Sequence, residues 1–193
     1  MLDQEVQTDR SELVASIWEM VIDMKLPLTV VHYNALLRVH LENKFQFDPE
    51  AISNQMKEKK IDADKETYQC FISAYCQRGD IEGASKVLQT MKKMGYSVNE
   101  NIFNSLIIGH SQNGDLGRAQ GIVKVMKQCG LNPSTETYLT LACAFARVGD
   151  ISSMDRTVAE SCQAGCGFQD GDYLELLFVL CESEHKDQVK TFL

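Results

Sequence analysis

The sequence has little proline and no long hydrophobic run. Three prolines and a single tryptophan occur among 193 residues, of which 44% are hydrophobic and 24% charged. This composition excludes collagen-like, mucin-like and linker sequences, and it is typical of a folded globular chain. The longest apolar stretches, such as residues 174–180, are far shorter than the roughly 20 residues of a membrane-spanning helix. We therefore expect a folded chain with no membrane segment.

Targeting signals, disulfide spacings and excess positive charge are also missing. Residues 1–5 are acidic where a transit peptide carries Arg or Lys, so no targeting segment is visible. Seven cysteines form an odd set without a disulfide-framework spacing, which indicates a reducing compartment. The net charge of −8 argues against non-specific binding of nucleic acid, because that binding requires Lys and Arg to neutralise phosphates.

A repeat of fixed length is the main feature that the sequence does have. Five aromatic residues stand 35 residues apart: Tyr33, Tyr68, Phe103, Tyr138 and Tyr173. Three Gly-Asp pairs recur at the same interval, at residues 79–80, 114–115 and 149–150. This spacing predicts four repeats at residues 30–64, 65–99, 100–134 and 135–169, with a partial fifth repeat at 170–193. Residues 1–29 are expected to end a preceding repeat, with one helix over about 11–25.

Each repeat is predicted to be a helical hairpin. Apolar residues recur at positions i, i+3, i+4 and i+7, which places them on one face of a helix. The Gly-Asp pair then ends the first helix and caps the second. One hairpin cannot bury its own apolar face, so the expected fold is all-α, a right-handed α-solenoid of antiparallel hairpins with the first helices inside. In the first repeat Lys44 replaces the turn glycine, and Asp48 followed by Pro49 predicts a late start of the second helix.

This pattern resembles the pentatricopeptide repeat. The shared features are the 35-residue period, the Tyr-Asn near the start, the glycine at the turn, and the Ala and Met of the second helix. The tetratricopeptide repeat has a period of about 34 residues and a different signature. The segments HYNALLRVHLEN (32–43) and TYQCFISAYCQRGDIEGASKVL (67–88) look like the amino-terminal repeat array of a leucine-rich animal member of the family that acts in mitochondria.

The resemblance implies a function in RNA metabolism. It implies an RNA-binding protein of the mitochondrial matrix, with a nuclear pool, that stabilises messenger RNAs and supports their polyadenylation and translation. It also implies two partners, single-stranded messenger RNA and a small protein with an RNA-recognition motif.

The resemblance further implies which residues meet the bases. In the family, the residue after the repeat aromatic and the last residue of the repeat select one base. The base-reading pairs are then Asn34 with Asp64, Gln69 with Asn99, and Asn104 with Ser134. The first pair favours uridine and the third cytidine, whereas the second matches no strong rule. The fourth repeat offers Leu139, which cannot hydrogen-bond to a base.

Other positions of the family pattern concern the base face and the phosphate. Val31 matches the aliphatic residue that sandwiches a base, whereas Glu66, Asn101, Glu136 and Gly171 at the equivalent positions do not. The phosphate contacts are expected from Arg147 and from Arg78, since the other equivalent positions hold Glu42, Gln77, Gln112 and Glu182. Most lysines lie on the outward-facing second helices. We therefore expect this chain alone to bind RNA weakly, in about the micromolar range, and to add to a longer array by avidity.

Several residues have a simpler interpretation. The Asn residues at the base-reading positions are alternatively helix-start residues, and the last residues of the repeats are alternatively polar residues of the exit turn. The repeat aromatics are expected in the core. His40 and His110 are expected to be buried or half-buried in the helical packing. Cys162 and Cys166 have no second ligand pair, so no metal site is expected.

No enzyme and no cofactor are expected. No nucleophile-base arrangement, phosphate-binding glycine loop or paired-carboxylate motif fits the hairpin array. The competing hypothesis is an acidic protein-interaction scaffold that docks a basic partner without contacting RNA.

Overall fold

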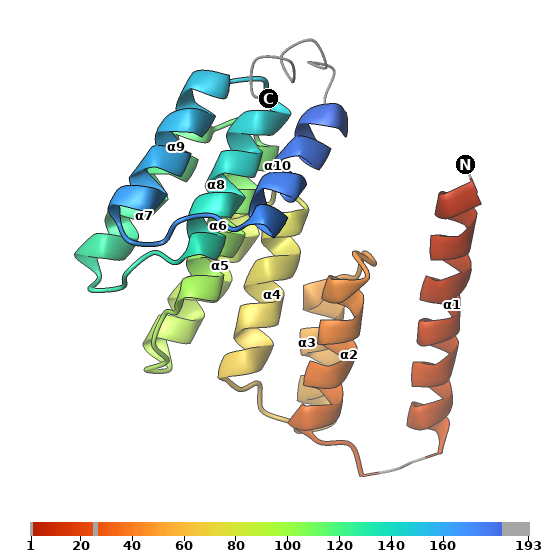
Figure 1. The fold of residues 1–193 in the computed structure, drawn as a ribbon. Coiled ribbons are helices and arrows are strands. Elements are labelled where there is room, and N and C mark those ends of the chain that lie inside the picture. Colours follow the sequence, from red (N-terminus) through yellow and green to blue (C-terminus); the bar gives the residue numbers. More distant parts are fainter. Residues whose placement is uncertain (1, 25–26, 183–193) are drawn as a thin grey trace.

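Ten α-helices make up the part of the chain that the computed structural model describes, residues 2–24 and 27–182 (Figure 1). Within these residues there is no strand, which confirms the all-α class. The helices are α1 (Leu2–Asp23), α2 (Val30–Glu42), α3 (Pro49–Glu58), α4 (Lys65–Gln77), α5 (Ile81–Lys93), α6 (Glu100–Gln112), α7 (Leu116–Gln128), α8 (Thr135–Arg147), α9 (Ile151–Gln163) and α10 (Asp170–Glu182).

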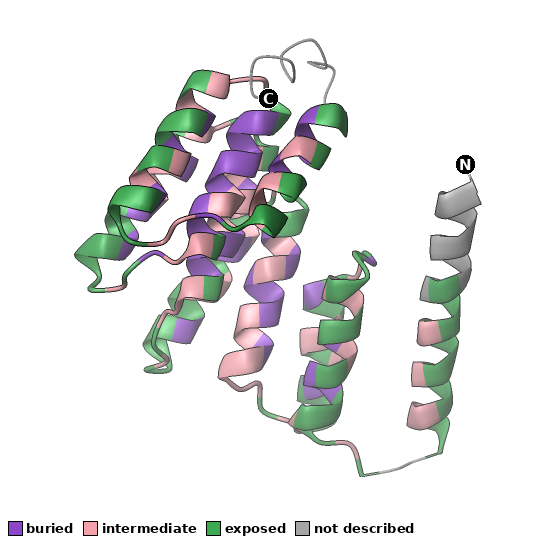
Figure 2. Ribbon diagram, in the orientation of Figure 1, coloured by how far each residue is buried: buried purple, intermediate pink, exposed green. Residues whose placement is uncertain are grey.

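The helices form a solenoid of two layers. The first helices of the repeats, α2, α4, α6, α8 and α10, contact one another in that order, and α5, α7 and α9 each pack against the helix before them. Buried residues concentrate on α4, α6 and α8, which have six to eight each, whereas α7 and α9 have three each (Figure 2). The layer of first helices therefore carries most of the core, as the spacing of the apolar residues predicts.

The Gly-Asp turns adopt the predicted geometry. Gly79, between α4 and α5, has a φ of 71°, in the left-handed region that glycine tolerates best. The Asp80 side chain then accepts a hydrogen bond from the Gly83 amide at 2.8 Å and caps α5. Asp115 and Asp150 cap α7 and α9 in the same way.

The first repeat departs from this geometry as expected. Helix α3 begins at Pro49 after the N-cap Asp48 and has ten residues, whereas α5, α7 and α9 have 13. Lys44 stands at the turn position with a φ of 56°, and Lys60 has a φ of 57° where the later repeats have glycine. Both lysines hold a backbone conformation that costs a residue with a side chain roughly 1–2 kcal/mol.

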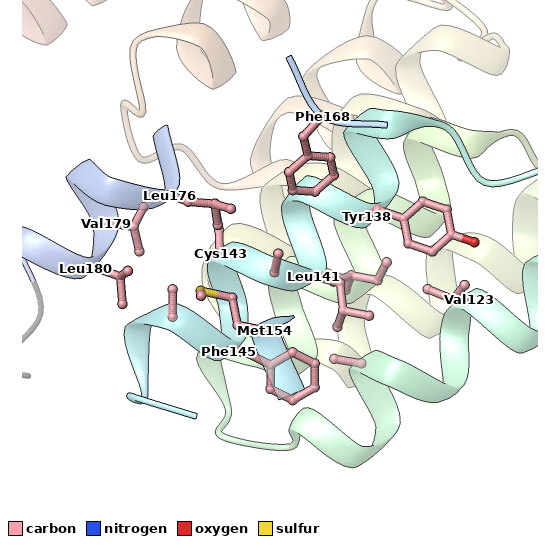
Figure 3. Close-up of a cluster of buried hydrophobic side chains, with 14 residues drawn as sticks. Val123, Tyr138, Leu141, Cys143, Phe145, Met154, Phe168, Leu176, Val179 and Leu180 are labelled. Carbon is pink, nitrogen blue, oxygen red and sulfur yellow. The ribbon is translucent and has the colours of Figure 1, made fainter. Parts of the chain in front are cut away.

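The core is continuous between repeats. Tyr138, Leu141 and Phe145 of α8 share one buried cluster with Met154 of α9 and Leu176 of α10. In Figure 3, Met154 and Leu176 lie on one side of Leu141 and Tyr138 lies on the other. All five side chains are at most 4% exposed. Their packing joins the fourth repeat to the fifth.

The repeat aromatics confirm their predicted core role to different degrees. Tyr33 and Tyr138 are completely buried, and Phe103 is 6% exposed. Tyr68 and Tyr173 are half-buried and pack against the cores beside them. His40 and His110 are half-buried, as predicted, and burial lowers the pKa of His110.

The first helix is longer than the sequence pattern predicts. Helix α1 begins at Leu2, whereas the apolar pattern placed its start near residue 11, because residues 2–10 contain no proline or glycine to prevent an earlier start. The Trp18 ring lies edge-on to Tyr33 of α2, with ring centroids 5.0 Å apart. Its indole N–H donates to the side-chain oxygen of Gln55 in α3 at 3.5 Å. These contacts join α1 to the first hairpin. None of the described helices is both long and apolar enough to cross a membrane.

Candidate nucleic-acid interface

The predicted base-reading residues lie at the junctions between successive first helices. Asn34, Gln69, Asn104 and Leu139 are each the fifth residue of their helix, on α2, α4, α6 and α8. Asp64, Asn99 and Ser134 are the N-cap residues of α4, α6 and α8. Each predicted pair therefore joins one first helix to the start of the next one in the row.

At the first junction, Asn34 is held in an internal hydrogen-bond network. Its amide nitrogen donates to both carboxylate oxygens of Asp64, at 3.0 and 3.1 Å. Its amide oxygen accepts from the Thr67 hydroxyl at 2.7 Å, and the side chain is only 2% exposed. The predicted pair is brought together, and its members bind each other.

Asp64 also caps α4, whereas the alternative interpretation made it only a polar residue of the exit turn. It accepts hydrogen bonds from the Thr67 amide at 2.9 Å and from the Thr67 hydroxyl at 3.0 Å. Burial raises the pKa of Asp64, but these hydrogen bonds and those from Asn34 outweigh burial and leave the pKa below its ordinary value. Asp64 is therefore a stable carboxylate with strong acceptor character at neutral pH.

A neighbouring ion pair neutralises the glutamate at the sandwich position of the second repeat. The Arg38 side chain lies 3.2 Å from Glu66, and Asn34 also approaches Glu66 at 3.5 Å. Pairing reduces the repulsion that a free carboxylate would exert on a phosphate chain.

The third junction has the opposite arrangement, because Asn104 is buried without partners. Asn104 is 6% exposed, and neither its amide nitrogen nor its amide oxygen forms a hydrogen bond with any described residue. Leaving a buried donor or acceptor unpaired costs roughly 1–3 kcal/mol. A group with a matching acceptor and donor would remove that cost.

Glu100 explains the difference between the two junctions. Thr137 stands at the position equivalent to Thr67, 33 residues after its Asn, but its hydroxyl donates to Glu100 at 2.9 Å. The Ser134 hydroxyl and amide donate to the same Glu100 oxygen, the amide at 3.3 Å. Glu100 lies one turn before Asn104 on α6. It binds Ser134 and Thr137, which stand at the positions of Asp64 and Thr67, the two residues that hold Asn34 at the first junction.

The second junction contains no direct bond between Gln69 and Asn99, and the fourth has Leu139, whose side chain forms no hydrogen bond. Asn99 caps α6 by accepting from the Ile102 amide at 3.3 Å, and Gln69 is half-buried. A bond of 2.8 Å between the hydroxyls of Ser73 and Ser105 joins α4 to α6 instead. Leu139, in the fourth repeat, packs against the apolar core. Val31, the predicted base-sandwich residue, is 64% exposed on α2.

The predicted phosphate contacts share one pocket of about 490 Å³. Arg78 and Arg147 line it at the C-terminal ends of α4 and α8. Lys44 lines it too, although the family pattern does not predict Lys44 as a phosphate contact. The lining holds no carboxylate, and none of the three cations forms an ion pair with a described residue. In a chain with 27 acidic and 19 basic residues, this pocket is a local concentration of positive charge.

Sequence comparison identifies the repeat. The profile of the pentatricopeptide repeat domain matches residues 16–78 and 86–147, and a profile of the single repeat matches 66–96. The "Leucine-rich PPR motif-containing protein, mitochondrial" of Xenopus tropicalis is 38% identical over 100 residues, and that of Mus musculus is 40% identical over 92 residues. These matches cover 52% and 48% of this chain and 7% of each relative.

Solved structures show the same architecture. The pentatricopeptide repeat protein PPR10, in complex with an 18-nt psaJ RNA element, superposes with a TM-score of 0.79 at 19% identity, over 93% of this chain and 26% of that chain. The PPR domain of Arabidopsis thaliana protein-only RNase P 1, in complex with tRNA, gives a TM-score of 0.56 at 16% identity, over 83% and 85% of the two chains. At these identities the likeness concerns the fold, an α-solenoid of helical hairpins.

Proposed function

Because the chain belongs to the pentatricopeptide repeat family, we propose that it is an RNA-binding segment of a mitochondrial post-transcriptional regulator. Two arguments support the proposal. The matched relatives are named as mitochondrial proteins, and neighbours of the same fold are complexes with RNA. In this role the chain binds single-stranded messenger RNA and supports its stability, polyadenylation and translation. A small protein with an RNA-recognition motif is the proposed partner, and a nuclear pool is part of the same proposal.

The observation that carries the proposal is the unpaired amide of Asn104. A cytosine edge offers an acceptor and a donor, which match the amide nitrogen and oxygen of Asn104. The polar groups that would compete for Asn104 are bound to Glu100. We assign the strongest base selection to the pair Asn104 and Ser134.

The other junctions contribute less to base selection. Asn34 with Asp64 selects uridine once the bond from Thr67 to Asn34 opens, and Val31 covers one face of that base. Gln69 with Asn99 accepts a base with no strong preference. Arg78 and Arg147 bind the phosphates from the cationic pocket. With so few cations along the row, the affinity of this chain alone is weak, and flanking repeats add to it by avidity.

A titration against short unstructured RNAs tests the proposal. The chain should bind a U/C-rich oligonucleotide more tightly than an A-rich one, and its affinity should fall as salt rises. Asn104→Ala should reduce the preference for cytidine. Asn132→Ala, an exposed amide between α7 and α8, is the matched control and should bind as the unmodified chain does. Equal binding of both RNAs without a salt dependence would refute the function.

The second candidate function is the acidic scaffold, which the net charge of −8 favours. In that case a basic protein partner binds the array and RNA does not. Under this second hypothesis, capture of such a partner should be unaffected by the double change Asn34→Ala and Asn104→Ala. Under the first hypothesis, the same double change should abolish RNA binding. The two measurements separate the candidates.

A further inference from the structure

We infer that Lys44 supplies the phosphate contact of the first repeat, where its ligand is the phosphodiester backbone of single-stranded RNA. The inference rests on the proposed function, and it adds a residue that the family pattern does not include.

The pocket follows the register of the repeats. Gln77, Gln112 and Arg147 are equivalent residues, 35 positions apart, at the ends of α4, α6 and α8, and all three line the pocket. The equivalent residue of the first repeat is Glu42, which does not line the pocket and whose charge would repel a phosphate. Lys44, two residues later, does line it. The pocket therefore continues into the first repeat with a cation in place of the unsuitable glutamate.

The backbone at Lys44 has a left-handed conformation. Its φ of 56° lies where Gly79, Gly114 and Gly149 of the later repeats have φ values of 71–74°. Glycine adopts this conformation at much lower cost, so the turn itself gives no reason for a lysine. Strained backbone positions of this kind concentrate at functional sites.

The turn that contains Lys44 is held in place by its neighbours. The Phe45 amide donates to the His40 carbonyl at 2.8 Å, and Phe45 is only 8% exposed. The His40 ring lies edge-on to the rings of Phe45 and Phe47, with centroids 6.1 and 5.4 Å apart. Phe45 and Phe47 also line the pocket. The residues that follow Lys44 are thus anchored, and the lysine is presented at the pocket from a fixed backbone.

Lys60 provides a matched control for both the strain and the charge. It has the same left-handed backbone at the end of α3, and glycine replaces it in the later repeats. It lines a different pocket, which also contains Glu50 and Asp62. A lysine at a helix end also interacts favourably with the last carbonyls of the helix. The change in stability of a Lys60 variant reports that interaction alone, because Lys60 lies outside the cationic pocket.

The test compares Lys44→Gly, Lys60→Gly and Lys44→Arg in the full 193-residue chain, using a U/C-rich oligonucleotide at several salt concentrations. Both glycine variants should raise the melting temperature by about 1–4 °C, because the backbone strain is relieved. Lys44→Gly should weaken RNA binding by about three- to tenfold and should reduce the slope of log affinity against log salt by about 0.7. Lys60→Gly and Lys44→Arg should leave the affinity and the slope unchanged.

The outcomes separate this inference from the proposed function. If the unmodified chain binds RNA and Lys44→Gly binds it with the same affinity and salt slope, the role of Lys44 is wrong while the function stands. If Lys60→Gly weakens binding as much as Lys44→Gly, general surface charge explains the effect and the inference is also wrong. If the unmodified chain binds no RNA, the function and the inference both fail.

Discussion

The amide nitrogen of Asn34 donates to both carboxylate oxygens of Asp64, at 3.0 and 3.1 Å. Two residues predicted to select a base together thus also join two helices in the absence of RNA. A residue that has both roles must exchange internal bonds for bonds to the base. Asn104 needs no such exchange, because it has no described partner to release.

Replacing the two asparagines by leucine should have opposite effects on stability. Asn104→Leu removes a buried, unpaired amide and should raise the free energy of unfolding by about 1–2 kcal/mol. Asn34→Leu leaves Asp64 and Thr67 without their partner and should lower the free energy of unfolding by about 1–3 kcal/mol. Leu139 shows that the equivalent position accommodates leucine. Urea denaturation, monitored by circular dichroism, measures the free energy of unfolding of both variants. A loss of stability in Asn104→Leu would mean that its amide is bonded after all.

The stability that Asp64 provides should depend on pH. Because hydrogen bonds lower its pKa in the folded chain, the stabilising contribution is complete above the unfolded pKa and is lost as the pH falls through the folded pKa. Asp64→Asn should therefore be less stable than the unmodified chain near neutral pH, and the difference should shrink between about pH 5 and pH 2. Asp62→Asn, an exposed aspartate, controls for the loss of one negative charge. A difference that is constant over this range would contradict the assignment.

Tyr138→Phe should stabilise the fold. The Tyr138 hydroxyl is buried and has no hydrogen-bond partner among the described residues, while the ring is completely enclosed. Removing the hydroxyl should raise the free energy of unfolding by about 1 kcal/mol, and the third repeat already has Phe103 at this position. Tyr68→Phe, at a half-buried ring, should change stability by less than about 0.5 kcal/mol. Thermal denaturation compares the melting temperatures of the two variants with that of the unmodified chain. A lower melting temperature for Tyr138→Phe would contradict the assignment of its hydroxyl as unpaired.

The cysteines should divide into two reactivity groups. Burial raises the pKa of Cys70 and Cys143 to about 11 and that of Cys76 to about 12, so these thiols are almost entirely protonated at pH 8. The exposed thiols at residues 129, 162 and 181 should react with iodoacetamide first. Peptide mass spectrometry over a time course measures the order of labelling. Modification of Cys76 as fast as Cys129 would indicate that α4 opens readily.

The sequence predicts the elements of this fold well because each element depends on local chemistry. A glycine followed by an aspartate ends one helix and caps the next wherever it occurs, so the turns at Gly79 and Asp80 follow from two adjacent residues. The even spacing of the aromatics predicts the stacking of the repeats in the same way. The start of α1 differs from the prediction because seven of the nine residues 2–10 are polar and give no apolar repeat, although all nine are compatible with a helix.

The state of the candidate site is harder to predict, because it depends on contacts between repeats. Asn34 and Asn104 occupy identical positions in the sequence pattern, yet one is fully bonded and the other is not. The difference arises from Glu100, which only becomes relevant once Thr137 of the next repeat is packed against it. Likewise, Lys44 and Arg147 are far apart in the chain, and only the stacking of first helices brings them to one pocket.

The row of first helices also has a mechanical consequence. Because each of these helices packs on its neighbours in turn, a small rotation at one junction displaces every position beyond it, and such rotations accumulate along the array. The bonds of Asn34 resist this rotation between α2 and α4, and the bonds from Ser134 and Thr137 to Glu100 resist it between α6 and α8. The pitch of the superhelix is therefore held at both junctions, and an incoming strand would have to exchange these bonds in order to change the angle there.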